Sequence, residues 1–176
     1  MKTTLIALLL CIASLLPAAA VAGDKPVNLA LVDPVQIFKN DQSITGLRLN
    51  LIYGKNANMT GLDAGIANAA SGDFAGIQWG IVNMVGQSAS GIQLGWVNLA
   101  DEGGAGLQYA LANINKGGKY TGLQVGYYNQ ANEYAGLQFG LVNFARQTEG
   151  LQIGLINIIK KGGWFPVFPI INGSFK

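Results

Sequence analysis

The chain has 176 residues, of which 50% are hydrophobic and only 11% are charged; 11 basic and 9 acidic side chains give a formal net charge of +2. This balance excludes the basic surface of a nucleic-acid-binding protein, and the charged fraction is well below the roughly 25% of ordinary soluble domains. The chain has no histidine and a single cysteine, Cys11, so the common zinc sites and Cys/His nucleophile pairs are excluded. We therefore expect no catalytic, metal-binding or cofactor-binding residues, and no enzymatic activity.

The first 22 residues have the pattern of a secretory signal peptide. Lys2 precedes an apolar run over residues 5–16, and an Ala-Val-Ala sequence ends at Ala22. This pattern predicts cleavage after Ala22, with an N-terminal membrane anchor as the alternative. Cleavage would also remove Cys11. We expect an exported protein whose residues 23–176 form a single β-repeat domain.

Residues 27–39 are expected to be extended, but Pro34 interrupts them. Proline cannot donate to a β-ladder, so this segment predicts an edge strand or two short strands with a bend.

Residues 45–159 contain eight copies of one phrase, Gly-Leu-Gln-x-Gly-Leu-x-Asn, at intervals of 14 to 16 residues. A repeat this short predicts an array of near-identical structural elements. Five to eight residues rich in Gly, Asn, Ser and charges separate the phrases and have the composition of turns. The copies begin at Gly46, Gly61, Gly76, Gly91, Gly106, Gly122, Gly136 and Gly150.

Each phrase alternates between two kinds of residue. In the copy over residues 136–143, one face carries Leu137, Phe139 and Leu141, while the other carries glycines and Gln138. Period-2 alternation predicts a β-strand with one apolar face and one small or polar face. If each phrase is a full strand, the whole chain forms an all-β antiparallel meander of about ten short strands, as an outer-membrane barrel or barrel segment. A β-sandwich and a β-solenoid are the alternatives; the solenoid would need a patterned apolar return wall, and the turn segments lack one.

The apolar face needs a cover, because exposed patches rarely exceed a few hundred Å². Lipid is the expected cover, given the predicted export and the low charge. The lipid-facing residues are expected to include Leu107, Tyr109, Leu111, Leu137, Phe139, Leu141, Leu151, Ile153 and Leu155.

The second face is expected to be the inner one, as either the lining of a narrow lumen or a packed, dry interior. Repeated glycine within a strand requires close approach of another backbone, curvature, or room for a neighbouring side chain. The Asn that ends each phrase is expected to start a turn. The inner-face residues are Arg48, Asp63, Gln78, Gln93, Gln108, Gln124, Gln138 and Gln152.

Residues 164–175 end the chain with an aromatic, partly alternating segment that predicts a final strand. Pairing of this strand with residues 27–38 would close a barrel within one chain, whereas pairing with a second chain would make a ring. We expect a homo-oligomer held by edge-strand contacts.

The repeats resemble those of exported surface-repeat proteins of Gram-negative bacteria. The resemblance is carried by residues 136–143 and 43–56, and it extends to residues 34–38 and to the aromatic C-terminus. It implies an outer-membrane or cell-surface location rather than an activity. Outer-membrane barrels typically end on an aromatic residue, whereas here Phe175 is followed by Lys176. The sequence thus predicts a non-enzymatic outer-membrane β-protein, either a narrow pore or a structural lipid-contacting assembly. The alternative is a secreted soluble β-repeat interaction module. Membrane lipid is the expected partner, and no nucleic-acid partner is expected.

Overall fold

A computed structural model of the chain describes residues 25–175. The predicted signal peptide lies outside these residues, and its cleavage stays a prediction. The described chain is all-β, as the sequence predicts.

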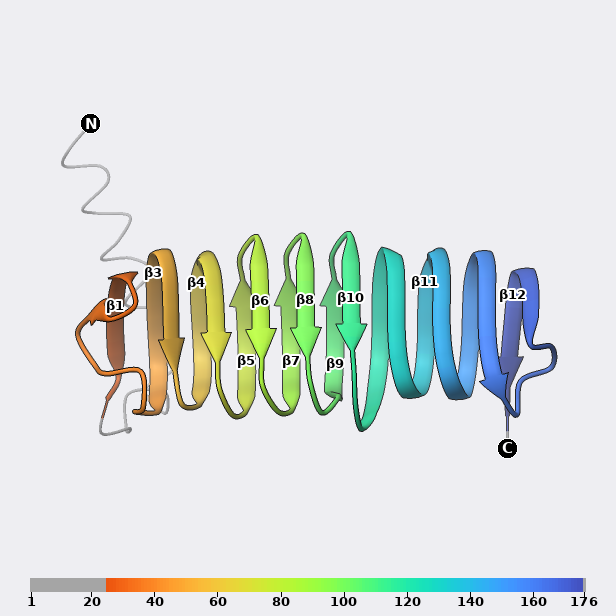
Figure 1. Cartoon of the computed structure of the whole chain (residues 1–176), viewed down its shortest axis with the longest axis horizontal. Helices are drawn as coiled ribbons and strands as arrows, with labels where there is room; N and C mark the ends of the chain where they lie inside the picture. The colour runs from red at the N-terminus through yellow and green to blue at the C-terminus, as the bar shows by residue number, and fades with distance from the viewer. Residues whose placement is uncertain (1–24, 176) are drawn as a thin grey trace.

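The protein is a β-solenoid in which each repeat forms one coil and successive coils stack as parallel strands (Figure 1). Equivalent residues of the repeats are direct neighbours, so that Gly61 pairs with Gly76 and Gly76 with Gly91. Hydrogen bonds therefore run along the axis of the rod, with coils about 4.8 Å apart. The strands are β1 (Val27–Val32), β2 (Val35–Gln36), β3 (Ile44–Asn56), β4 (Met59–Ala70), β5 (Phe74–Trp79), β6 (Val82–Val85), β7 (Ala89–Leu94), β8 (Val97–Ala100), β9 (Gly104–Tyr109), β10 (Ala112–Asn115), β11 (Lys119–Lys161) and β12 (Val167–Ser174).

One coil shows the plan of all of them. Strand β5 forms a leading arm, Gly80 and Ile81 form a bend, β6 forms a trailing arm, and residues 86–88 connect to the next coil. Strands β3, β4 and β11 follow the same path without a break, β11 through the last three repeats. All bends lie along one edge of the rod, which we call the bend edge, and all connections lie along the opposite edge, the connection edge (Figure 1).

The expected antiparallel meander and barrel are wrong, and the solenoid alternative is confirmed. The error lies in treating each phrase as one strand. The fifth residue of the phrase, such as Gly80, is where the chain bends, so the phrase already contains both walls of the coil. The turn segments need no apolar pattern because they only connect coils.

The ends of the rod are formed by the two segments outside the repeats. Strand β1 adds a parallel strand to β3, and the two-residue β2 folds back on β1 beyond Pro34, as the sequence predicts. Strand β12 covers the last coil in the antiparallel direction. These segments lie at opposite ends (Figure 1), so closure of one chain by pairing them is also wrong. The expected homo-oligomer stays a prediction.

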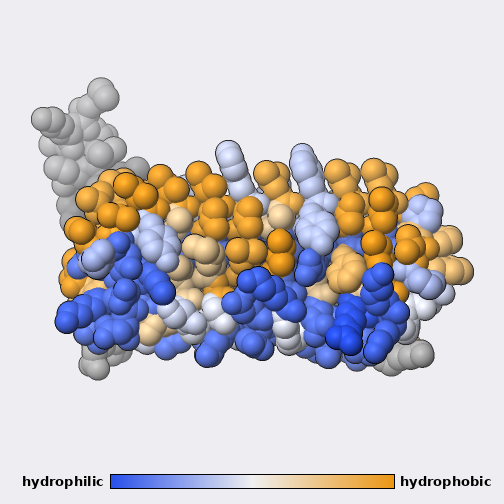
Figure 2. Space-filling view, viewed as in Figure 1, coloured by the Kyte–Doolittle hydropathy of each residue, from blue (hydrophilic) through white to orange (hydrophobic). Residues whose placement is uncertain are grey.

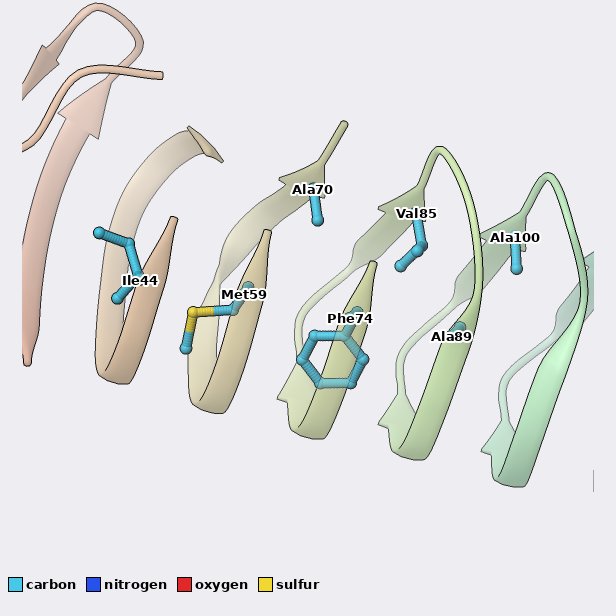
Figure 3. Packing of buried hydrophobic residues seen from close by; sticks show 7 residues of the cluster. All are labelled: Ile44, Met59, Ala70, Phe74, Val85, Ala89 and Ala100. Atoms are coloured by element: carbon cyan, nitrogen blue, oxygen red, sulfur yellow. The ribbon is translucent and has the colours of Figure 1, made fainter. Parts of the chain in front are cut away.

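Near the connection edge, the interior is apolar. Ile44, Met59 and Phe74 stack along the leading arms, and Ala70 and Val85 face them from the trailing arms (Figure 3). Met59 and Phe74 face the smaller Ala70 and Val85, whereas in the following coil both positions hold alanine.

Further along the rod the same position holds Tyr120 and Tyr134, whose rings stack with centroids 6.1 Å apart. Ala131 and Ala145 complete this cluster. Burial raises the pKa of both phenols, and for Tyr134 the neighbouring Tyr120 raises it further. Both tyrosines are therefore neutral packing residues at physiological pH.

Candidate functional site: the apolar bend edge

Along the bend edge, the polarity of exterior and interior is reversed relative to an ordinary globular protein. Figure 2 shows hydrophobic side chains along the bend edge and hydrophilic ones along the connection edge. The interior behind the bend edge is polar, made of Gln and Asn side chains that are almost completely buried. The residues that the sequence assigns to the inner face all lie there, which makes the inner face a packed interior rather than the lining of a lumen.

The glutamines form a continuous ladder along the axis. Gln93 Nε2 donates to Gln78 Oε1 over 2.8 Å, and Gln108 Nε2 donates to Gln93 Oε1 over 2.7 Å. Gln124, Gln138 and Gln152 continue the pattern at 2.6–2.8 Å. Each amide donates to the preceding coil, so the ladder satisfies buried polar groups that would otherwise be costly.

The asparagines form a second ladder nearer the bend, which runs in the opposite direction. Asn83 Nδ2 donates to Asn98 Oδ1 of the following coil over 2.8 Å and also to the carbonyl of Leu94 over 3.0 Å. The expected role of this Asn as a turn initiator is therefore incomplete: it joins successive coils and holds the carbonyl that precedes the next bend. The ladder is formed by Asn68, Asn83, Asn98, Asn113, Asn129, Asn143 and Asn157.

Removing one rung of the glutamine ladder should destabilise the fold. In a Gln138→Leu variant, Gln124 Oε1 loses its donor. An unpaired buried amide costs roughly 1–3 kcal/mol, so we expect the free energy of unfolding in urea to fall by that amount. The control is Gln147→Leu on the exposed connection edge, expected within about 0.5 kcal/mol of wild type. Equal losses in the two variants would contradict a stabilising role for the ladder.

The first coil preserves the asparagine ladder by an exchange of two residues. Gly54 pairs with Asn68 and so occupies the ladder position, while Asn50 pairs with Gly65 and occupies the bend position. The Asn50 side chain fills the space left by Gly54, where a Cβ would lie 1.8 Å from Asn50 Oδ1. Asn50 Nδ2 then donates to Asn68 Oδ1 over 2.7 Å, so the ladder begins in the first coil.

The glutamine ladder ends in a buried ion pair. Arg48 Nε and Nη2 donate to the two carboxylate oxygens of Asp63 at 2.8 and 2.7 Å, and both side chains are fully buried. Gln78 Nε2 also donates to Asp63, and Arg48 Nη1 donates to Asn56 Oδ1 and to the carbonyl of Ala69. The two charges that replace Gln in the first two repeats therefore neutralise and orient each other, as a buried pair requires.

The nine residues expected to face lipid all lie on the outside of the coils, with side chains half-buried or exposed. Their contact with lipid stays a prediction. Tyr109, Phe139 and Leu155 are 58%, 52% and 67% exposed. Sequence reasoning missed that the apolar surface turns around an edge, because it treated the phrase as one flat strand.

Two rows of side chains border the bends and enclose a groove of about 800 Å³ along the rod. Its floor is formed by the small bend residues, from Gly65 to Gly140. The residues that line it are uncharged and mainly apolar or aromatic; its walls include Trp79, Leu94 and Tyr109 on one side and Ile81, Trp96 and Leu111 on the other.

The backbone at the bends is hydrogen-bonded between coils even though this edge is exposed. Gly80 N donates to the carbonyl of Leu94 over 3.0 Å, and Ile81 N donates to the carbonyl of Ile66 over 2.8 Å. Gly95 N and Trp96 N make the equivalent bonds at 3.0 and 2.9 Å. This pairing continues the ladder between coils around the bend, so these backbone groups are satisfied without water.

The connection edge carries most of the charge of the coils. Its ion pairs, such as Lys116–Asp101 at 2.8 Å and Lys119–Glu149 at 2.7 Å, are exposed and contribute little to stability. Within residues 25–175, no group of His, Cys, Asp or Glu side chains is arranged to hold a metal ion. The same described part of the chain contains no helix long and apolar enough to span a membrane.

Fold and surface together define an all-β repeat solenoid with a hydrogen-bonded polar interior and an apolar edge. Comparison of the chain with protein-family models, curated proteins and solved structures found no match.

Proposed function

We propose that this protein is an exported, non-enzymatic β-repeat module of the Gram-negative cell surface, which binds membrane lipid through its bend edge. The observation that carries the proposal is the apolar edge whose backbone groups already bond one another. A surface that enters hydrocarbon must satisfy its polar groups internally. The resemblance of the repeats to exported surface-repeat proteins supports the proposed location.

The shape of the apolar surface favours lipid over a single protein partner. Apolar residues continue from the bend onto both arms, as shown by Ile77 on a leading arm and Ile156 on a trailing arm, which are 43% and 46% exposed. One rigid partner covers one side of such a ridge, whereas fluid lipid surrounds it.

The length of the arms is suited to insertion of the rod into one leaflet of a membrane. A leading arm such as β5 has 6 residues, which span roughly 20 Å at about 3.3 Å per residue. The hydrocarbon of one leaflet is about 15 Å thick. The rod would therefore lie along the membrane with the bend edge immersed and the charged connection edge in water, as amphipathic monotopic elements do. This arrangement replaces the pore expected for a barrel.

A vesicle flotation assay tests lipid attachment. Phe139→Arg places a charge on the apolar edge, and insertion of an arginine into hydrocarbon costs roughly 2.5–3.5 kcal/mol. We expect the wild type to float with phospholipid vesicles and the variant to lose at least about tenfold in partitioning. Gln147→Arg, on the connection edge, is the matched control and should float like the wild type. A wild-type protein that stays in the aqueous fraction, or equal partitioning of both variants, would reject lipid attachment by this edge.

A further inference from the structure

The groove along the bend edge is straight, because its walls are built from equivalent positions of successive coils. It extends from the coil of Gly65 to the coil of Gly140, which are five coil steps apart in the repeat. At about 4.8 Å per coil, its length is roughly 24 Å. Its floor is one residue wide at each bend, so the groove has the form of a narrow channel rather than a broad patch.

The chemistry of the groove selects a ligand that neither carries charge nor forms hydrogen bonds. The lining residues are uncharged, and the exposed ion pairs lie on the opposite edge of the rod. An extended peptide binds a sheet edge through free backbone groups, but here the amides of Gly80, Gly95 and Ala110 already donate to the next coil. A peptide strand would therefore lose hydrogen bonds to water without replacing them.

A second copy of the chain also fits the groove poorly. Its apolar surface is a ridge of two side-chain rows, with tips such as Trp79 and Trp96 67% and 61% exposed. The groove, with about 800 Å³ over roughly 24 Å, has a mean cross-section of only about 33 Å², which suits one narrow chain rather than two rows of side chains. A linear hydrocarbon chain is narrow enough and matches the uncharged lining. An extended chain advances about 1.3 Å per carbon, given C–C bonds near 1.5 Å. Roughly 18 carbons fill the 24 Å of the groove.

We propose that the bend-edge groove holds one lipid acyl chain, extended along the rod axis between the Trp79 row and the Ile81 row. The proposal rests on the proposed lipid contact and adds a defined site to it: one chain lies along the rod, and the remaining lipid surrounds the ridge. The backbone of the bends forms the floor of the groove, because a side chain at Gly80 would point inward, toward Asn68 Nδ2 and Asn83 Oδ1, whereas residues on either side of the bend project outward.

Monomeric saturated fatty acids from octanoic to eicosanoic acid, competing with the fluorescent polyene cis-parinaric acid, test the site. Affinity should rise about three- to fourfold per methylene and level off near 18 carbons, with one chain bound per protein. Energy transfer should reach the polyene from Trp96 and Trp79, and it should persist in a Trp164→Phe variant, because Trp164 lies in the segment that precedes β12. An affinity that rises evenly across the whole series, or several chains bound per protein, would overturn the proposal.

Two matched variants locate the binding. Leu111→Asp places a carboxylate in the groove wall, whereas Ile77→Asp places one on a leading arm outside the groove; the two native side chains are 48% and 43% exposed. We expect at least roughly tenfold weaker chain binding for Leu111→Asp and less than about twofold for Ile77→Asp. Equal effects would overturn the groove assignment.

Flotation of the wild type with phospholipid vesicles separates this proposal from the proposed function. Flotation without saturable binding of a single chain rejects the groove and retains lipid attachment. Binding of a single chain without flotation retains the groove and rejects attachment to membranes.

Discussion

Replacing Asp63 with Gln should lower the free energy of unfolding by about 3–5 kcal/mol, because it leaves the buried guanidinium of Arg48 without its counter-ion. Of its native acceptors, Arg48 would keep the neutral Asn56 Oδ1 and the carbonyl of Ala69. Urea unfolding monitored by circular dichroism measures the loss. Arg48→Gln should cost a similar amount, because it leaves the carboxylate of Asp63 buried and unpaired.

The double variant Arg48→Gln/Asp63→Gln should be more stable than either single variant. Gln at both positions would extend the ladder that now begins at Gln78 by two rungs, and it removes both buried charges at once. We expect the double variant to recover most of the loss, giving an interaction energy of at least about 2 kcal/mol in a double-mutant cycle. Additive losses would show that the two side chains act independently and that the pair does not determine the stability of the first two coils.

The two faces of the repeat follow directly from the sequence. Leu137 and Phe139 are outside and Gln138 is inside, because alternation assigns residues to opposite faces of a strand whichever way that strand is paired. The extended segments around Pro34 and after Trp164 were also predictable, since proline and aromatic residues influence the conformation of their own stretch of chain. The all-β structure and the repeat architecture were predictable from the period of the sequence pattern alone.

Pairing direction was not predictable on the same basis. A leading arm, a bend and a trailing arm over residues 74–85 have almost the same alternation as one long strand. The bend at Gly80 lacks the Asn-Gly or Asp-Gly signature of a hairpin turn, and its φ angle is not in the left-handed region. The decisive contacts are between coils, where Asn83 meets Asn98, and a local pattern does not contain them. The apolar edge could not be foreseen for the same reason, because it exists only once the phrase bends.

The first glycine of each repeat should be the least replaceable residue of the fold. Gly106 has φ = 126°, and a Cβ there would lie 2.0 Å from the carbonyl oxygen of Gly91 in the preceding coil. This backbone region is essentially restricted to glycine, and other residues in it cost on the order of 1–3 kcal/mol before any collision is counted. The obstacle is backbone rather than a movable side chain, so the coils must separate locally. We expect Gly106→Ala to lower the free energy of unfolding by about 3 kcal/mol or more, measured by urea unfolding.

Two further substitutions separate backbone strain from collision. Gly162 has φ = 77°, but no atom lies within 4 Å of an added Cβ. Gly162→Ala therefore introduces backbone strain without a collision and should lower the free energy of unfolding by roughly 1 kcal/mol. Gly95, at a bend, has an ordinary φ but meets the carbonyl oxygen of Gly80 at 2.7 Å. Because Ala110 occupies the equivalent bend position in the next coil, Gly95→Ala should fall between the other two variants. A Gly106→Ala protein as stable as Gly162→Ala would show that the coils can move apart at little cost, and that close stacking of backbones does not explain why all eight repeats begin with glycine.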